Sequence, residues 1–131
     1  MFLDASVMIA IMAREEEGTG LAARLAAAER VYTSPIAIYE AALALARLRN
    51  TSATGAEAVV HHFLAAFEVE IIPITGEIGR GAVLAFEQFG RGQHPARLNM
   101  GDCFAYACAR ALDVPLLFKG DDFGQTDIAP A

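Results

Sequence analysis

The fold of this 131-residue chain is decided by the stretch Val-Tyr-Thr-Ser-Pro-Ile-Ala-Ile-Tyr-Glu at residues 31–40. Its first three residues form a β-branched and aromatic run, which is typical of a short strand. Ser34 and Pro35 then give a helix-start signal, because serine caps helix N-termini and proline is favoured at the first helical position. The stretch therefore predicts a strand that passes directly into a helix, which runs to about Arg49.

This alternation of strand and helix extends over the whole chain. Short apolar runs predict strands at 2–3, 31–33, 69–74 and 115–118. Helical patterns, several of them capped by Ser, Thr or Asn, predict helices at 6–13, 19–29, 34–49, 52–67, 75–89 and 99–112, with a Gly- and Pro-rich loop at 90–95. Strands separated by helices indicate βαβ units, and hence an α/β fold whose parallel sheet is covered by helices on both faces. No repeat or linker interrupts the pattern, so residues 1–131 are expected to form a single domain.

The composition excludes several classes of protein. With 55% hydrophobic residues the chain is not disordered, and its net charge of −6 argues against a generic nucleic-acid coat protein. The most apolar stretch, 36–46, is about half the length needed to span a bilayer, and no signal peptide is recognisable, so we expect no membrane contact. Cys103 and Cys108 are expected to be free buried thiols, which favours a cytoplasmic location. The apolar excess suggests a surface reserved for a partner.

Acidic residues follow the predicted strands, where ligands bind in parallel sheets. They are Asp4 after the first strand, Glu40 in the helix after the second, Asp102 in the first turn of the helix at 99–112, and the Asp121-Asp122 pair after the last strand. Glu40 is the most informative, because it shares the apolar stripe of its helix with Ile36 and Leu43, where an unpaired charge is costly.

Each of these residues also has a purely structural explanation. Asp4 can cap the following helix, Asp102 can complete a capping box, and an Asp pair after a glycine is common in turns. Glu40 can pair with Arg14 or Arg47. Together, however, carboxylates at one sheet edge repel one another, and a divalent cation compensates that repulsion. Oxygen ligands without His or Cys favour Mg²⁺ or Mn²⁺, ions suited to phosphoryl chemistry.

Four segments of the chain together resemble the motifs of PIN-domain ribonucleases, and more specifically the VapC toxins of bacterial type II toxin–antitoxin pairs. They are Met-Phe-Leu-Asp-Ala-Ser at 1–6, Tyr-Glu at 39–40, Leu-Asn-Met-Gly-Asp-Cys at 98–103 and Leu-Phe-Lys-Gly-Asp-Asp-Phe at 117–123. The resemblance covers essentially the whole chain. It implies a three-layer α/β/α sandwich with a central, mainly parallel sheet, and a Mg²⁺- or Mn²⁺-dependent endoribonuclease that cleaves RNA by attack of a metal-activated water on a phosphodiester.

The acidic positions of the family carry over residue by residue. Asp4, Glu40 and Asp102 match three of them, and Asp122, directly before Phe123, matches the more regular fourth position. Asp121 is the alternative fourth residue. The resemblance implies that Asp4, Asp102 and Asp122 arrange the metal and that Glu40 holds metal or water.

Other residues are candidates for contact with the substrate. Ser6, in the Asp-x-Ser opening, is expected to orient a ligand water or carboxylate, as the resemblance implies. Arg91, His94 and Arg97 lie in the loop before the Asp102 helix, within reach of RNA phosphates, and Lys119 stands beside the Asp pair. The alternative for this loop is an ordinary solvated segment.

The resemblance also implies protein partners. A VapC toxin pairs with a small VapB-like antitoxin, which would block the acidic site, and usually forms a homodimer. The Ala- and Leu-rich segments 21–28 and 36–48 are candidate surfaces for such contacts. Their small residues are equally explained by close packing between helices.

Two other functions compete with this interpretation. A haloacid-dehalogenase-like Mg²⁺ phosphatase would also use Asp4, Lys119 and a late Gly-Asp-Asp turn, but it needs a second Asp where this chain has Ser6. A PIN-like protein that binds RNA without cleavage is the other alternative, and the intact acidic set argues against it.

Overall fold

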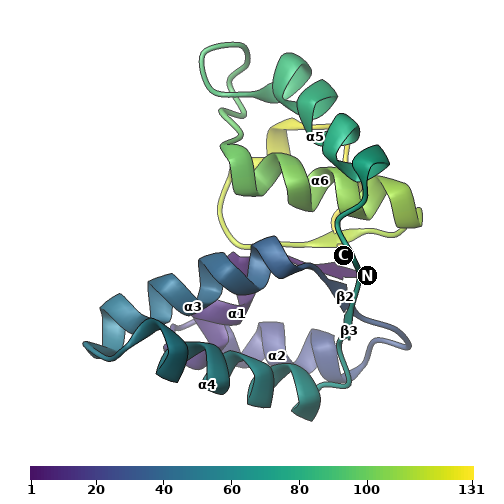
Figure 1. Ribbon diagram of the computed structural model, residues 1–131. Coiled ribbons are helices and arrows are strands. Elements are labelled where there is room, and N and C mark those ends of the chain that lie inside the picture. The colour runs from purple at the N-terminus through teal and green to yellow at the C-terminus, as the bar shows by residue number, and fades with distance from the viewer.

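A parallel four-stranded sheet lies at the centre of the computed structural model, which describes all 131 residues (Figure 1). The strands are β1 (Phe2–Leu3), β2 (Tyr32–Thr33), β3 (Glu70–Ile71) and β4 (Leu116–Leu117). Their order is β3-β2-β1-β4, and every neighbouring pair is parallel. The predicted α/β fold is confirmed, with β1 in the interior of the sheet.

Three strands are shorter than the sequence indicates, and the one predicted at 31–33 loses only Val31. The predicted strand at 69–74 is reduced to β3, although the Ile72 amide still donates to the Thr33 carbonyl at 2.9 Å. The pairing stops there because β2 ends at Thr33, where Ser34 caps the next helix and leaves no strand for residue 74 to pair with. After β4, the Lys119 amide donates to the Ser6 hydroxyl instead of to a neighbouring strand.

Six α-helices and one 3₁₀ turn surround the sheet. They are α1 (Ala5–Met12), α2 (Gly18–Ala26), α3 (Pro35–Arg49), α4 (Ala53–Ala66), α5 (Gly76–Phe89), α6 (Met100–Leu112) and η1 (Phe123–Gln125). The predicted caps are confirmed: Ser34, Ser52, Thr75 and Asn99 each accept a hydrogen bond from an amide in the first turn. The second helix ends three residues earlier than predicted, and the following segment turns so that the Tyr32 amide reaches the Met1 carbonyl at 2.9 Å.

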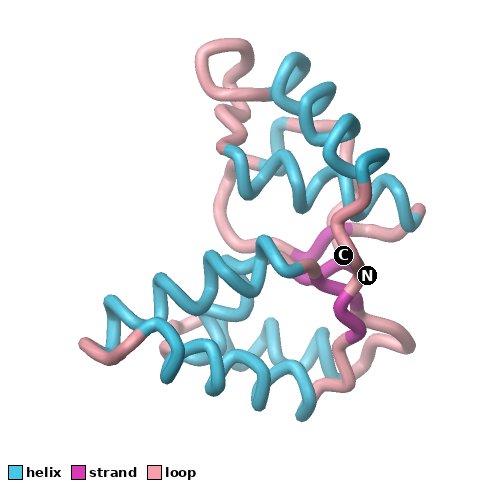
Figure 2. Tube along the Cα trace, in the orientation of Figure 1, coloured by secondary structure: helices cyan, strands magenta, loops and turns pink.

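Alternating side chains of the strands separate two apolar cores. Leu3 and Leu117 point toward α1–α4, whereas Phe2 and Leu116 point toward α5 and α6. All four side chains are almost fully buried. Helices therefore cover both faces of the sheet, which confirms the three-layer α/β/α sandwich (Figure 2).

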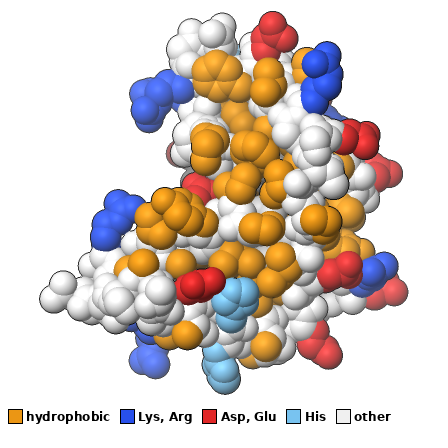
Figure 3. All heavy atoms as spheres, in the orientation of Figure 1, with side chains coloured by type: hydrophobic (Ala, Val, Ile, Leu, Met, Phe, Trp, Pro, Cys, Tyr) orange, Lys and Arg blue, Asp and Glu red, His pale blue; other side chains and the backbone are white.

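The two helical layers diverge on one side of the sheet, and Figure 3 shows a hollow between them with acidic side chains inside it.

Cys103 and Cys108 are buried and unpaired, as predicted. No helix is both long and apolar enough to cross a bilayer.

Candidate active site

Asp4 occupies the junction between β1 and α1 and is buried in the sheet edge. Its Oδ2 accepts hydrogen bonds from the Ser6 amide at 2.9 Å and from the Ser6 hydroxyl at 2.5 Å. The expected capping role is therefore real, because the carboxylate caps α1. It uses only one of the two carboxylate oxygens.

Glu40 projects from α3 toward the first turn of α6. A Cβ placed on Gly101 would overlap the Glu40 carboxylate, so the glycine is what lets this side chain lie against the helix backbone. Glu40 forms no ion pair, and Arg47 instead donates to the Leu43 carbonyl of its own helix at 3.4 Å. The pairing of Glu40 with an arginine is thus not found. Sequence reasoning missed Gly101, although its place directly before Asp102 was a usable signal.

Asp102 lies in the first turn of α6 and completes a capping box with Asn99. Asp102 Oδ2 accepts from the Asn99 amide, and the Asp102 amide donates to Asn99 Oδ1, both at 3.0 Å. This reciprocal pair fixes the orientation of the carboxylate. As at Asp4, the second oxygen remains available.

The Asp121-Asp122 pair is exposed in the turn after β4. Gly120 begins the turn with a φ of +104°, a conformation that favours glycine. Of the two carboxylates, Asp122 is the one that acts electrostatically on Asp4 and Asp102.

The surroundings of these carboxylates disfavour their charged forms. Burial raises the pKa of Asp4, against the lowering effect of the Ser6 hydrogen bonds. Burial and then repulsion by Asp4 and Asp102 raise the pKa of Glu40 to about 7. Burial likewise raises the pKa of Asp102 to about 6, with further contributions from Asp4 and Asp122. No Lys or Arg pairs with any of them, so the protein leaves this acidic cluster uncompensated.

The donor atoms of the cluster are all carboxylate oxygens, and their chemistry limits which metal they could hold. In this conformation no three His, Cys, Asp or Glu side chains converge closely enough to hold a metal ion of any kind, so the acidic residues are neighbours without forming a complete ligand set. Carboxylate oxygens are the ligands that Mg²⁺ prefers, and this ion keeps several of its waters. By their chemistry the residues present therefore suit a Mg²⁺ or Mn²⁺ ion that is held by one or two carboxylates and keeps most of its waters.

The sequence of this chain is similar to those of known proteins. The family model described as the PIN domain matches residues 1–129. The chain belongs to the PIN-domain family. It is 37% identical to a VapC ribonuclease of Rhizobium meliloti (strain 1021) over 139 residues, which cover 97% of this chain and 98% of the relative.

Two solved structures share the fold of this PIN domain. VapC20 of Mycobacterium tuberculosis, described as a Sarcin-Ricin loop cleaving toxin, superposes with a TM-score of 0.78 at 17% identity, covering 99% of this chain and 97% of its own. A toxin–antitoxin complex from Klebsiella pneumoniae gives a TM-score of 0.71 at 18% identity, covering 96% and 92%.

The loop before α6 presents two unpaired arginines in this PIN domain. Arg91 and Arg97 are exposed and make no ion pair. A hollow of about 550 Å³ lies between them, lined only by residues of the loop. His94 makes contacts within this loop, since its Nδ1 accepts from the Ala96 amide at 3.1 Å and its ring packs edge-on against Phe89, and its contact with substrate stays a prediction.

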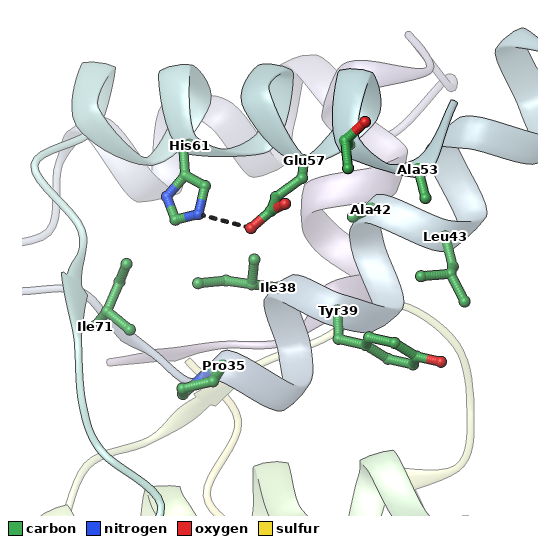
Figure 4. A pocket seen from close by; sticks show the side chains of 10 residues that line it. Pro35, Ile38, Tyr39, Ala42, Leu43, Ala53, Glu57, His61 and Ile71 are labelled. Atoms are coloured by element: carbon green, nitrogen blue, oxygen red, sulfur yellow. Dashed lines mark ion pairs between the residues drawn. The ribbon is translucent and has the colours of Figure 1, made fainter. Parts of the chain in front are cut away.

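An apolar groove of about 480 Å³ runs between α3 and α4 of the PIN domain (Figure 4). Ile38, Tyr39 and Leu43 line one wall, and on the other His61 Nε2 lies 3.6 Å from a carboxylate oxygen of Glu57. None of the predicted acidic residues lines this groove, so it is separate from the acidic cluster.

Proposed function

We propose that this PIN-domain protein is a Mg²⁺-dependent endoribonuclease and the toxin of a toxin–antitoxin pair. The observation that carries the proposal is the uncompensated cluster of Asp4, Glu40 and Asp102 at the carboxyl edge of the sheet. Identity of 37% to a VapC ribonuclease over nearly the whole chain supports the same activity.

In this proposal Asp4, Asp102 and Asp122 hold Mg²⁺ or Mn²⁺, and Glu40 holds the metal or a water. A metal bound there supplies an activated water and stabilises charge on the scissile phosphate. The chain itself prepares the ligands: Ser6 holds Oδ2 of Asp4, and Asn99 holds Oδ2 of Asp102. Each carboxylate therefore keeps its other oxygen for a metal or for one of its waters.

RNA is the proposed substrate, with Arg91 and Arg97 contacting its phosphates. Both guanidinium groups are free of acidic partners and lie in the segment that leads into the Asp102 helix. Replacing both arginines by alanine should weaken RNA binding. It should also make the association constant less dependent on salt, so that the negative slope of log K against log salt becomes shallower by about one to two. The matched control replaces Arg24 and Arg80, which are exposed and equally unpaired, and should leave the slope unchanged. An unchanged slope in the Arg91/Arg97 variant would remove RNA contact from this loop.

A VapB-like antitoxin and a second copy of the chain are the proposed protein partners. The Klebsiella pneumoniae relative in fold is a toxin–antitoxin complex, which supports the first. Of the two candidate segments, 21–28 buries Leu21 and Leu25 in the core, so close packing explains it. The segment 36–48 leaves Tyr39 and Leu48 61% exposed, and it is the better partner surface.

Cleavage of a purified single-stranded RNA tests the activity. The wild-type protein should cut it in Mg²⁺ and not in EDTA, and Asp102→Asn should not cut it in either buffer. Release of phosphate from a phosphomonoester without RNA cleavage would favour the phosphatase alternative. RNA binding with no cleavage under any metal would favour the binding-only alternative.

A further inference from the structure

Lys119 is held from two directions at the start of the turn that carries Asp121 and Asp122. Its amide donates to the Ser6 hydroxyl at 3.0 Å, and that hydroxyl in turn donates to Asp4. Its ammonium forms an ion pair with Glu15 and lies 3.5 Å from a carboxylate oxygen of Glu17. The side chains of Lys119 and Glu15 are each only 35% exposed, so this contact is half-buried.

The two glutamates belong to a rigid connection between α1 and α2. The Glu15 amide donates to the Ala10 carbonyl at 2.9 Å, and the Gly18 amide donates to the Glu15 carbonyl at 2.9 Å. A Cβ on Gly18 would stand 2.8 Å from the Ala10 carbonyl oxygen, so this segment packs tightly against α1. Glu15 is therefore presented to Lys119 by a fixed backbone.

The turn itself needs such an anchor. Its far end is fixed by Phe123, which is buried and packs against Phe118 with ring centroids 5.1 Å apart. Between these anchors Gly120, with its φ of +104°, and both aspartates are exposed. A glycine-containing segment of this kind is mobile unless its ends are held.

We infer that Glu15, Glu17 and Lys119 form a clamp that positions the Asp121-Asp122 turn beside Asp4, and that Lys119 is a positioning residue and not an RNA contact. A lysine that faces two carboxylates offers no net positive charge to a phosphate. The inference rests on the proposed function, because the positioned turn supplies the fourth acidic ligand.

Three variants test the clamp. Glu15→Gln with Glu17→Gln removes the acidic side of the clamp while keeping its shape, and Lys119→Met removes the ammonium. Glu16→Gln is the matched control, because Glu16 lies in the same connection, is exposed and makes no ion pair. Thermal melting of each variant checks that the fold is retained.

Amide hydrogen exchange reports on the turn without any metal. The clamp predicts about three- to tenfold faster exchange at the backbone amide of residue 119 in the Glu15→Gln/Glu17→Gln and Lys119→Met variants. The factor is small because a half-buried ion pair contributes only modestly to the stability of the turn. Mn²⁺ affinity, followed by the electron paramagnetic resonance signal of the free ion, should fall by a similar factor. Glu16→Gln should change neither quantity, and exchanging the charges in Lys119→Glu with Glu15→Lys should restore part of both.

If Lys119 instead contacts RNA, its substitution and the removal of its glutamates should change RNA affinity in opposite directions. Freed from its glutamates, Lys119 would then tighten RNA binding, measured in Ca²⁺ buffer, and Lys119→Met would weaken it. That result, or unchanged exchange and Mn²⁺ affinity in Glu15→Gln/Glu17→Gln, overturns the clamp alone. If the wild-type protein binds no Mn²⁺ and cuts no RNA, the proposed function fails, and the inference fails with it.

Discussion

Replacing Glu40 by glutamine should stabilise the metal-free protein at alkaline pH. Glu40 lies against the backbone at Gly101, and burial and neighbouring carboxylates raise its pKa to about 7. A glutamine keeps the size of the side chain but carries no charge to bury. The gain should disappear at low pH, where the wild-type carboxyl is itself protonated.

The size of the effect follows from the pKa. At about 1.4 kcal/mol per pH unit, the difference between the usual 4.5 and about 7 corresponds to about 3.5 kcal/mol. Glu40 remains partly in contact with solvent, so screening reduces the expected gain to about 1–2 kcal/mol. Because the pKa in the folded state lies above the unfolded value, the wild-type protein loses this stability as the pH rises from 4.5 to about 7.

Urea denaturation in EDTA at pH 5 and pH 8 measures this difference. Glu40→Gln should match the wild type at pH 5 and exceed it at pH 8. Mg²⁺ should then stabilise the wild type more than the variant. Destabilisation of the variant at pH 8, or the same change at both pH values, would show that Glu40 does not carry a buried and unfavourable charge.

Two further substitutions test other parts of the molecule. Gly101→Ala should displace the Glu40 carboxylate and lower Mn²⁺ affinity about tenfold. Its control Gly20→Ala, at a helical site with open space around it, should stabilise the fold by about 0.5–1 kcal/mol in urea denaturation. Tyr106→Phe removes a hydroxyl that donates to Asp127 at 2.6 Å and accepts from Arg110 at 3.2 Å. It should cost about 1 kcal/mol of stability and leave RNA cleavage unchanged, since these residues lie outside the acidic cluster.

The order of strands and helices could be predicted because local signals decide it. Four helices begin at a cap whose side chain accepts from an amide three residues later: Ser34, Ser52, Thr75 and Asn99. Both partners of each cap therefore lie within one short stretch of sequence. The length of β3 could not be predicted from its own β-branched residues, because its pairing ends where the neighbouring strand β2 passes into α3 after Thr33.

The sequence predicts which residues form the candidate site, but not the contacts that those residues make. The parallel topology brings Asp4, Glu40 and Asp102 to one edge, where Asp4 raises the pKa of both other residues and Asp102 raises that of Glu40. The ion pair of Lys119 with Glu15 joins residues 104 apart in the sequence, and no local sequence pattern predicts such a contact. Lys119 therefore stood out as a free cation in the sequence, whereas the fold supplies its partners.

Sequencing of RNA 5′ ends after expression of the wild type and of Asp4→Asn tests the central proposal most directly. Asp4 is buried at the sheet edge, and its Oδ2 is held by Ser6, so the asparagine preserves size while removing the charge that would bind metal. New RNA ends should appear at defined positions with the wild type and be absent with Asp4→Asn. Cuts that persist in Asp4→Asn would contradict the assignment of this acidic cluster as the catalytic centre.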